Sequence, residues 1–164
     1  MSQLVSTHSD FDATSWHDNY LYALKIDIGD IEAGDWRSDL VFDIDHITEW
    51  VKGDDGAIRF KVAPATLVFH HVTDLKLAID WGDSGHRTAL HEASIDHIER
   101  ARIADQQICL DRPYYRWRIA LNWPAGGDIS FGASGYTQTL RLAPVLNDEQ
   151  KLSVSLRRSP GGAG

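Results

Sequence analysis

Residues 115–123 read YRWRIALNW, and this stretch decides the fold class. Its large apolar residues occupy every second position, at Tyr115, Trp117, Ile119, Leu121 and Trp123. Successive side chains of a β-strand point to opposite faces, so this pattern predicts a strand with one face on a core and the other in water. The next segment, WPAGGD at residues 123–128, has the Pro and Gly residues of a tight turn and predicts a hairpin.

The same period of two recurs along most of the chain. It is clear in NYLYALKIDI (19–28), DLVFDID (39–45), AIRFKV (57–62) and DLKLAIDW (74–81), and further strands are predicted at ATLVFHHV (65–72), DISFGAS (128–134), YTQTLRL (136–142) and KLSVSL (151–156). In the first of these, Tyr20, Tyr22, Leu24, Ile26 and Ile28 are predicted to share one face. We expect a single all-β domain: an antiparallel β-sandwich or flattened, partly closed barrel of about nine or ten strands, with at most one short helix.

Three places interrupt this pattern. Ile44, Ile47, Trp50 and Val51 are spaced as on a helix, with Gly53 as a possible C-cap, so a helical turn is predicted after the second strand. Pro64 cannot donate a ladder hydrogen bond, which predicts a bulge, corner or strand break there. Residues 92–108 fit either the one short helix or another strand, and the pattern does not decide between them.

The amino-acid composition of the two termini predicts where the domain begins and ends. Residues 1–15 are expected to be a flexible N-terminal segment, 16–157 the domain, and 158–164 a disordered tail, since the last residues, RRSPGGAG (157–164), have the composition of a frayed end. The chain has one cysteine, Cys109, which permits no internal disulfide and fits a reducing compartment. No apolar run reaches membrane-spanning length and no secretory signal precedes the domain, so we expect a cytoplasmic location.

Acidic residues are concentrated in the first part of the chain. The formal net charge is −8, and residues 1–60 contain 13 acidic and 4 basic residues. Phosphate backbones repel such a surface, which argues against general nucleic-acid binding. A basic protein partner or a cation would suit it better.

Two acidic segments are predicted to lie close together. His17 and Asp18 begin the first long strand, and Asp43, Asp45 and His46 end the second. If these strands pair antiparallel, the end of one lies beside the start of the other. Such a cluster could hold a divalent cation or share a proton, as in a metal-assisted hydrolase. The spacing matches no specific ligand pattern, so a solvated sheet face explains it as well, and no catalytic residue, metal ligand or cofactor is assigned.

The six tryptophans fall into two groups. Trp81, Trp117 and Trp123 occupy apolar strand positions and are predicted to be in the core. Trp16, Trp36 and Trp50 lie at strand ends or in loops among acidic residues, an arrangement found in sugar-binding sites and in protein-interaction hot spots. We expect Trp16 to pack across the end of the sheet, with Asp18 accepting backbone N–H bonds and His17 pointing outward or toward Asp43 or Asp45.

Two resemblances add to this interpretation. WHDNYLYALKIDI, LVFDIDHITEW, FKVAPATLVFHHVTDLKLAIDW and YYRWRIALNWPAGGDISFGASGYTQTLRLAP together resemble a family of bacterial proteins of about this size, over roughly residues 15–145. That family carries no established activity, so the resemblance implies no catalytic residue. Separately, SWHDNYLYAL is similar, at Trp16, His17 and Asp18 and the following strand, to the opening of some small all-β immunity proteins of bacterial toxin systems.

These observations together predict a bacterial binding or protein-interaction module with an acidic N-terminal half. The alternatives are a metal-assisted hydrolase and a carbohydrate-binding β-sandwich. The residues expected to bind a ligand or partner are Trp16, His17, Asp18, Trp36, Asp43, Asp45, His46 and Trp50. A basic protein is the expected partner, nucleic acid and membrane are not expected, and the oligomeric state stays open, with a dimer possible.

Overall fold

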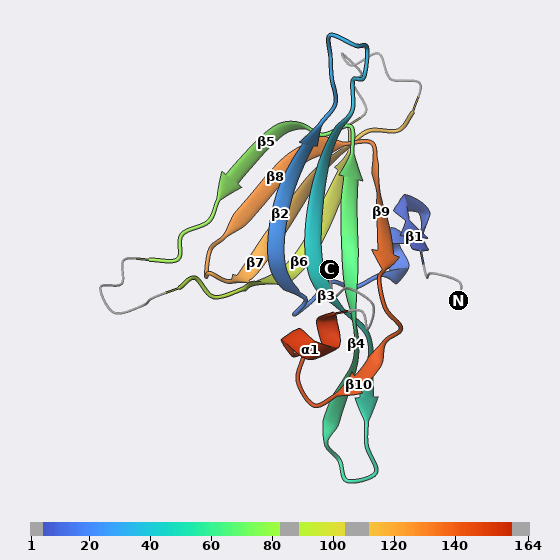
Figure 1. The fold of residues 1–164 in the computed structure, drawn as a ribbon, viewed down its shortest axis with the longest axis vertical. Coiled ribbons are helices and arrows are strands. Elements are labelled where there is room, and N and C mark those ends of the chain that lie inside the picture. The colour runs from blue at the N-terminus through green and yellow to red at the C-terminus, as the bar shows by residue number, and fades with distance from the viewer. Residues whose placement is uncertain (1–4, 83–88, 104–111, 159–164) are drawn as a thin grey trace.

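The computed structural model describes residues 5–82, 89–103 and 112–158, and these residues form an antiparallel β structure (Figure 1). The strands are β1 (Val5–Thr7), β2 (Tyr20–Ile28), β3 (Ser38–Lys52), β4 (Ile58–His70), β5 (Thr73–Ala78), β6 (Ala93–Arg102), β7 (Tyr115–Trp123), β8 (Asp128–Ala133), β9 (Gly135–Leu140) and β10 (Val145–Asn147). The helices in these ranges are the 3-10 helix η1 (His8–Ala13) and the four-residue α1 (Val154–Arg157). The all-β class, the strand number and the single short α-helix are confirmed for this part of the chain. Cys109 and residues 159–164 of the predicted tail lie outside the described residues.

One hydrogen-bonded path connects the strands in the order β1-β9-β4-β3-β2-β6-β7-β8-β5, and β10 pairs with the first part of β4. Every pairing between these strands is antiparallel. The path begins at β1 and ends at β5, so hydrogen bonding between the described strands does not close it into a barrel. No helix among the described residues has the length and apolarity needed to cross a bilayer.

A bent ribbon connects the two halves of this sheet. β4 runs into β5 through His71 and Val72, and β8 runs into β9 through Ser134 alone. The antiparallel register continues across the bend, from His70 opposite Gly135 to Thr73 opposite Gly132. The bend requires His71 to adopt a left-handed conformation, with φ of 56°. It also requires glycine at position 132, because a Cβ there would lie 2.7 Å from the Tyr114 ring.

The core lies between the halves that this ribbon connects. The alternating residues of β7 and β8 pair as predicted, with Trp117 opposite Phe131 and Ile119 opposite Ile129, and all four are buried. Phe69 of β4 contacts them from the other half, with ring centroids 5.0 Å from Trp117 and 4.7 Å from Phe131. Edge-to-face contacts of this kind stabilise a core beyond the area that they bury.

Two predictions around β3 and β4 are wrong. The helical turn is absent, because β3 continues as a strand to Lys52, with a bulge between Ile47 and Glu49. Pro64 lies inside β4 without a break. Its carbonyl accepts a hydrogen bond from the Arg141 amide, on the side where β9 has ended and β10 has not begun. Proline has no N–H to donate, but neither β9 nor β10 pairs with β4 at this position. No acceptor of a neighbouring strand is therefore left without a hydrogen bond.

The remaining differences concern which side chains face inward. A bulge between Leu21 and Ala23 places Leu21, opposite buried Ile44, on the same face as Ile26, opposite buried Leu40, whereas Tyr20 lies opposite Asp45. Ile26 and Ile28 are nevertheless 48% and 63% exposed, beyond the point where β6 stops pairing with β2. Trp123, predicted to be in the core, is 37% exposed at the end of β7. The open question about residues 92–108 is resolved in favour of a strand as far as Arg102, whereas residues 104–108 lie outside the described part of the chain.

Candidate functional site

β2 loses its partner on one side soon after it begins. It pairs with β6 only at Tyr20 and Leu21, although its pairing with β3 continues to Ile28. Residues 23–28 therefore have one edge without a strand partner among the described residues. Within the same ranges β5 pairs only with β8, so it has a free edge as well. Free edges expose backbone N–H and C=O groups that can pair with another chain.

A cavity of about 400 Å³ lies between β2 and the segments around β5 and β6. Its wall consists of Leu21, Tyr22, Ala23 and Leu24 from β2, Ile79 and Trp81 after β5, and Leu90, His91, Glu92 and Ala93 at the start of β6. The Trp81 indole N–H donates to the His91 carbonyl at 3.0 Å, which connects two parts of the far wall. The lining is mostly apolar, as in sites that bind apolar side chains or ligands.

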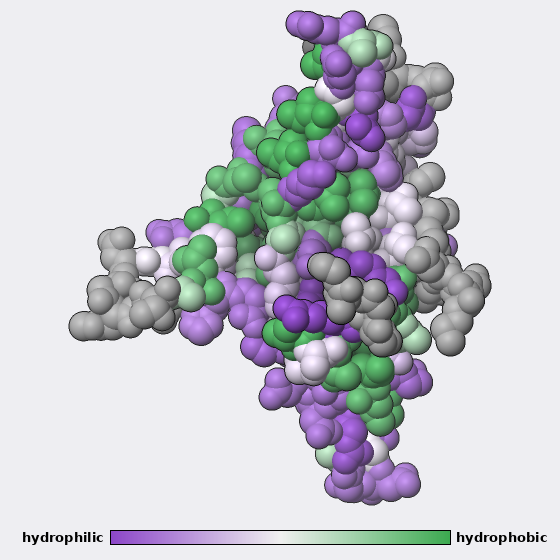
Figure 2. All heavy atoms as spheres, in the orientation of Figure 1, coloured by the Kyte–Doolittle hydropathy of each residue, from purple (hydrophilic) through white to green (hydrophobic). Residues whose placement is uncertain are grey.

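Exposed apolar residues adjoin the lining residues along β2 and β5, and we call the cavity together with these residues the β2–β5 groove. Ile26 and Ile28 on β2, Leu77 on β5 and Leu90 before β6 are 48%, 63%, 49% and 73% exposed. Figure 2 shows apolar side chains gathered over β2 and β5 on this face of the molecule. A contiguous exposed apolar surface of this kind commonly marks an interaction site.

Carboxylates surround one end of the groove. The turn between β2 and β3, with the residues beside it, contains Asp27, Asp30, Glu32 and Asp35 but only one basic residue, Arg37. Arg37 lies 3.4 Å from Asp35, and Lys25 lies 3.8 Å from Asp27, both in exposed ion pairs. The remaining carboxylates leave this end of the groove with a local negative charge.

The predicted juxtaposition of the first two long strands is confirmed, because Tyr20 lies opposite Asp45 and Ala23 opposite Asp43. Both carboxylates, however, bind the C-terminal segment. Arg157 donates to Asp43 at 2.6 Å and also bonds to Asp45. Arg141 donates to Asp43 at 2.5 Å.

Asp45 is completely buried and has a full set of donors. The Tyr22 hydroxyl donates to it at 2.9 Å, and the Leu152 amide at 2.8 Å. Burial and the negative charge of Asp45 raise the pKa of Tyr22. Among the residues that the structure describes, no group of three or more His, Cys, Asp or Glu side chains is arranged to hold a metal ion. Asp43 and Asp45 thus attach the chain end to the sheet.

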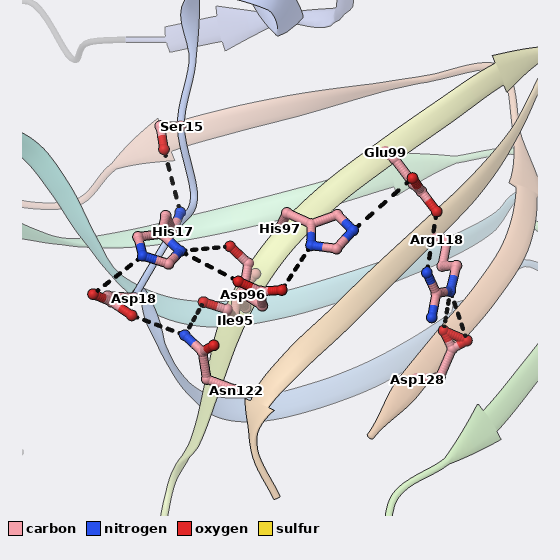
Figure 3. A network of polar contacts seen from close by, with 10 residues as sticks. All are labelled: Ser15, His17, Asp18, Ile95, Asp96, His97, Glu99, Arg118, Asn122 and Asp128. Atoms are coloured by element: carbon pink, nitrogen blue, oxygen red, sulfur yellow. Dashed lines mark hydrogen bonds and ion pairs between the residues drawn. The ribbon is translucent and has the colours of Figure 1, made fainter. Parts of the chain in front are cut away.

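His17 and Asp18 belong to a different network, on the outer face of β6 and β7 (Figure 3). The His17 ring points outward, with Nδ1 2.9 Å from the Asp96 carbonyl oxygen. Asp18 accepts from the side-chain amides of Asn122 and Gln150, both at 2.8 Å, rather than from backbone N–H groups. The same face continues through His97, Glu99, Arg118 and Asp128. Most of these side chains are exposed, so solvent screens their ion pairs and the network contributes little to the free energy of unfolding.

Four further predicted residues occupy separate places. Trp36 is 73% exposed between β2 and β3. Trp16 is 3% exposed and packs on Phe11 and Tyr136 at the end of the sheet, as expected. His17, His46 and Trp50 line a second cavity, under the N-terminal segment. The structure therefore divides the eight predicted residues among five regions, with His17 at two of them.

A histidine and a serine meet at the bend of the ribbon, where they resemble a nucleophile and its base. Arg112 Nη1 lies 2.9 Å from His71 Nε2 and 3.3 Å from Nδ1, and Nδ1 lies 2.8 Å from Ser134 Oγ. The serine hydroxyl in turn donates to the His70 carbonyl at 3.2 Å. The serine proton is thus directed at a backbone carbonyl and not at the imidazole, so the contact stabilises the bend and does not activate a nucleophile.

The sequence interpretation missed the residues that form the groove. Ile26 and Ile28 follow the alternation of a core strand, and the early end of the pairing between β2 and β6, which leaves them exposed, has no signature in the sequence. Leu77 and Leu90 were missed because no sequence signal shows that β5 is an edge strand. The strand predicted at residues 151–156 is wrong, because Val154–Arg157 form helix α1. Arg157, which binds both aspartates, lies just after that predicted strand and carried no signal of this role.

Comparison with known proteins found no matching family model, no matching curated sequence and no matching solved structure.

Proposed function

We propose that this protein is a non-enzymatic binding module that takes an extended segment of a basic partner protein into the β2–β5 groove. The observation that carries the proposal is a pair of strand edges, at residues 23–28 and at Thr73–Ala78, that have no partner in the described part of the chain and lie beside an apolar cavity. An enzymatic role has less support, because Arg141 and Arg157 already bind the acidic cluster.

An extended segment suits this groove better than a helix does. A strand added to the β2 edge would pair its backbone with the exposed N–H and C=O groups, which supplies affinity for any sequence. Alternate side chains of that strand would point toward the cavity lined by Leu24, Ile79 and Trp81. Apolar residues at every second position of the partner would therefore provide specificity.

The carboxylates at one end of the groove indicate that the partner segment is basic. The carboxylates at 27–35 would attract Lys or Arg residues at the alternate, outward-facing positions of the added strand. Such rim pairs raise association rates more than affinity and weaken with salt. We also place this module in the bacterial cytoplasm, where its single cysteine would stay reduced.

Selection from a random library of twelve-residue peptides tests this proposal. We expect the enriched peptides to alternate apolar residues with Lys or Arg, and to slow amide hydrogen exchange at residues 23–28 and Thr73–Ala78. Ile26→Asp or Leu77→Asp should weaken binding by at least about tenfold, because each places a carboxylate on the apolar surface.

Ile58→Asp is the matched control, since Ile58 is 54% exposed on β4, outside the lining of the groove. It should leave peptide binding unchanged. The proposal is overturned if no peptide is enriched, if the enriched peptides lack the alternation, or if they bind the groove variants as well as the parent protein.

A further inference from the structure

A second cavity, of about 550 Å³, lies between the N-terminal segment, β3 and β9. It is separate from the β2–β5 groove and has no lining residue in common with it. Its wall consists of Asp10, Ala13, Thr14, Ser15 and His17 from the N-terminal segment, His46, Ile47, Thr48, Glu49 and Trp50 from β3, and Gln138 and Leu140 from β9.

The hydrogen bonds around Asn19 determine the tautomer of His46. Asn19 is completely buried, and its Oδ1 accepts from the Ile47 backbone N–H at 3.2 Å. Since that N–H can only donate, the Asn19 amide nitrogen must face His46 Nδ1, 2.8 Å away. Nδ1 therefore accepts, and the proton of the neutral ring lies on Nε2. His46 is only 8% exposed, and Nε2 has no partner among the described residues.

Gln138 is oriented by the same kind of constraint. The Trp16 indole N–H, which can only donate, gives its hydrogen bond to Gln138 Oε1 at 2.8 Å. The amide nitrogen of Gln138 therefore has no hydrogen-bond acceptor in the described part of the chain. Gln138 is 3% exposed and lines the cavity. Two buried side chains therefore each keep one oriented N–H donor for this cavity.

The rest of the wall indicates the charge of the ligand. No Lys or Arg of the described ranges lines the cavity, and the nearby Lys61 is paired with Glu49 at 2.5 Å, so the wall offers no positive charge for an anion. Carboxylate and hydroxyl oxygens at the rim can accept hydrogen bonds from a ligand. Trp50, 50% exposed and in edge-to-face contact with Phe60, adds an aromatic surface next to these polar groups.

We propose that this cavity binds an uncharged saccharide unit. Sugar hydroxyls both donate and accept, so one ring can accept from His46 Nε2 and the Gln138 amide and donate to Glu49 Oε1, the oxygen that does not accept from Lys61. The C–H face of the ring packs on Trp50. A cavity of about 550 Å³ has room for a ligand of this size.

Nuclear magnetic resonance titration of the whole protein with neutral sugars tests this inference. The probes are glucose, galactose, mannose, N-acetylglucosamine and their disaccharides, with glucuronate, inorganic phosphate and nucleosides as competing classes. At least one neutral sugar at millimolar concentration should shift the His46 Nε2–H, the Gln138 side-chain amide and the Trp50 indole resonances together. Binding of phosphate, glucuronate or nucleosides without any neutral sugar would overturn the proposal, and so would the absence of any shift.

Two variants assign the site. Trp50→Ala removes an exposed ring and should weaken sugar binding by at least about tenfold. Trp36→Ala is its control, because Trp36 is 73% exposed between β2 and β3 and does not line the cavity. Gln138→Glu keeps the acceptor for Trp16 but replaces the donor, so it should also weaken binding, with its folding checked by thermal melting. Equal sugar affinity in all three variants contradicts the site.

Discussion

At the scale of single residues, His46 shows how a buried hydrogen bond selects one protonation state. A proton on Nδ1 would face the Asn19 amide, which is itself a donor. Burial lowers the pKa of His46 from 6.5 to about 4. The unfolded chain therefore takes up this proton near pH 6.5, and the folded protein only near pH 4. Between these values the unfolded state binds more protons, so the free energy of unfolding decreases as the pH falls.

We predict a loss of up to about 1.4 kcal/mol of unfolding free energy per pH unit across that window, from His46 alone. Urea denaturation at a series of pH values between 4 and 6.5 measures it. His46→Gln removes the titrating group and should give a flatter dependence on pH than the parent protein. Parallel curves for His46→Gln and the parent would show that the imidazole is not protected from protonation.

At the scale of elements, the C-terminal segment depends on Asp45 for its place. Helix α1 has four residues and none of them is buried, which is too short to be stable by itself. The Leu152 amide and the Arg157 guanidinium both bind the Asp45 carboxylate, and the guanidinium lies 3.7 Å from the centre of the Tyr22 ring. One buried carboxylate of β3 thus holds both ends of the segment 152–157.

Asp45→Asn should release this segment and cost about 3–5 kcal/mol of unfolding free energy, as expected when one partner of a buried ion pair is lost. Limited trypsin digestion with mass spectrometry should show faster cleavage after Lys151 and Arg157. Asp148→Asn is the control, since the Asp148 side chain is 87% exposed in its pair with Arg59. Unchanged cleavage in Asp45→Asn would mean that other contacts hold the segment.

At the scale of the whole molecule, the hydrophobic periodicity of the sequence predicts the β architecture. A sheet with one face on the core and the other in solvent requires apolar and polar residues to alternate. The alternation of Trp117, Ile119 and Leu121 is therefore visible in the amino-acid sequence alone. The bulge after Leu21 and the early separation of β2 from β6 are not, because they depend on how distant strands pair. The oriented donors of the second cavity were missed for the same reason, since Asn19 and Gln138 acquire their roles only through partners far away in sequence.

Two tryptophans of one strand test how the halves of the molecule hold together. Trp117 is completely buried, contacts Phe69 across the core, and donates its indole N–H to the Ala133 carbonyl at 3.2 Å. Trp117→Ala should cost about 3–5 kcal/mol of unfolding free energy, through the lost contacts and the cavity that remains. Trp123→Ala, on the same strand but at a residue that is 37% exposed, should cost less than about 1 kcal/mol. Urea denaturation of both variants measures the difference. Equal losses would mean that the end of β7 contributes as much to the core as its centre, contrary to the packing of Trp117 between the two halves.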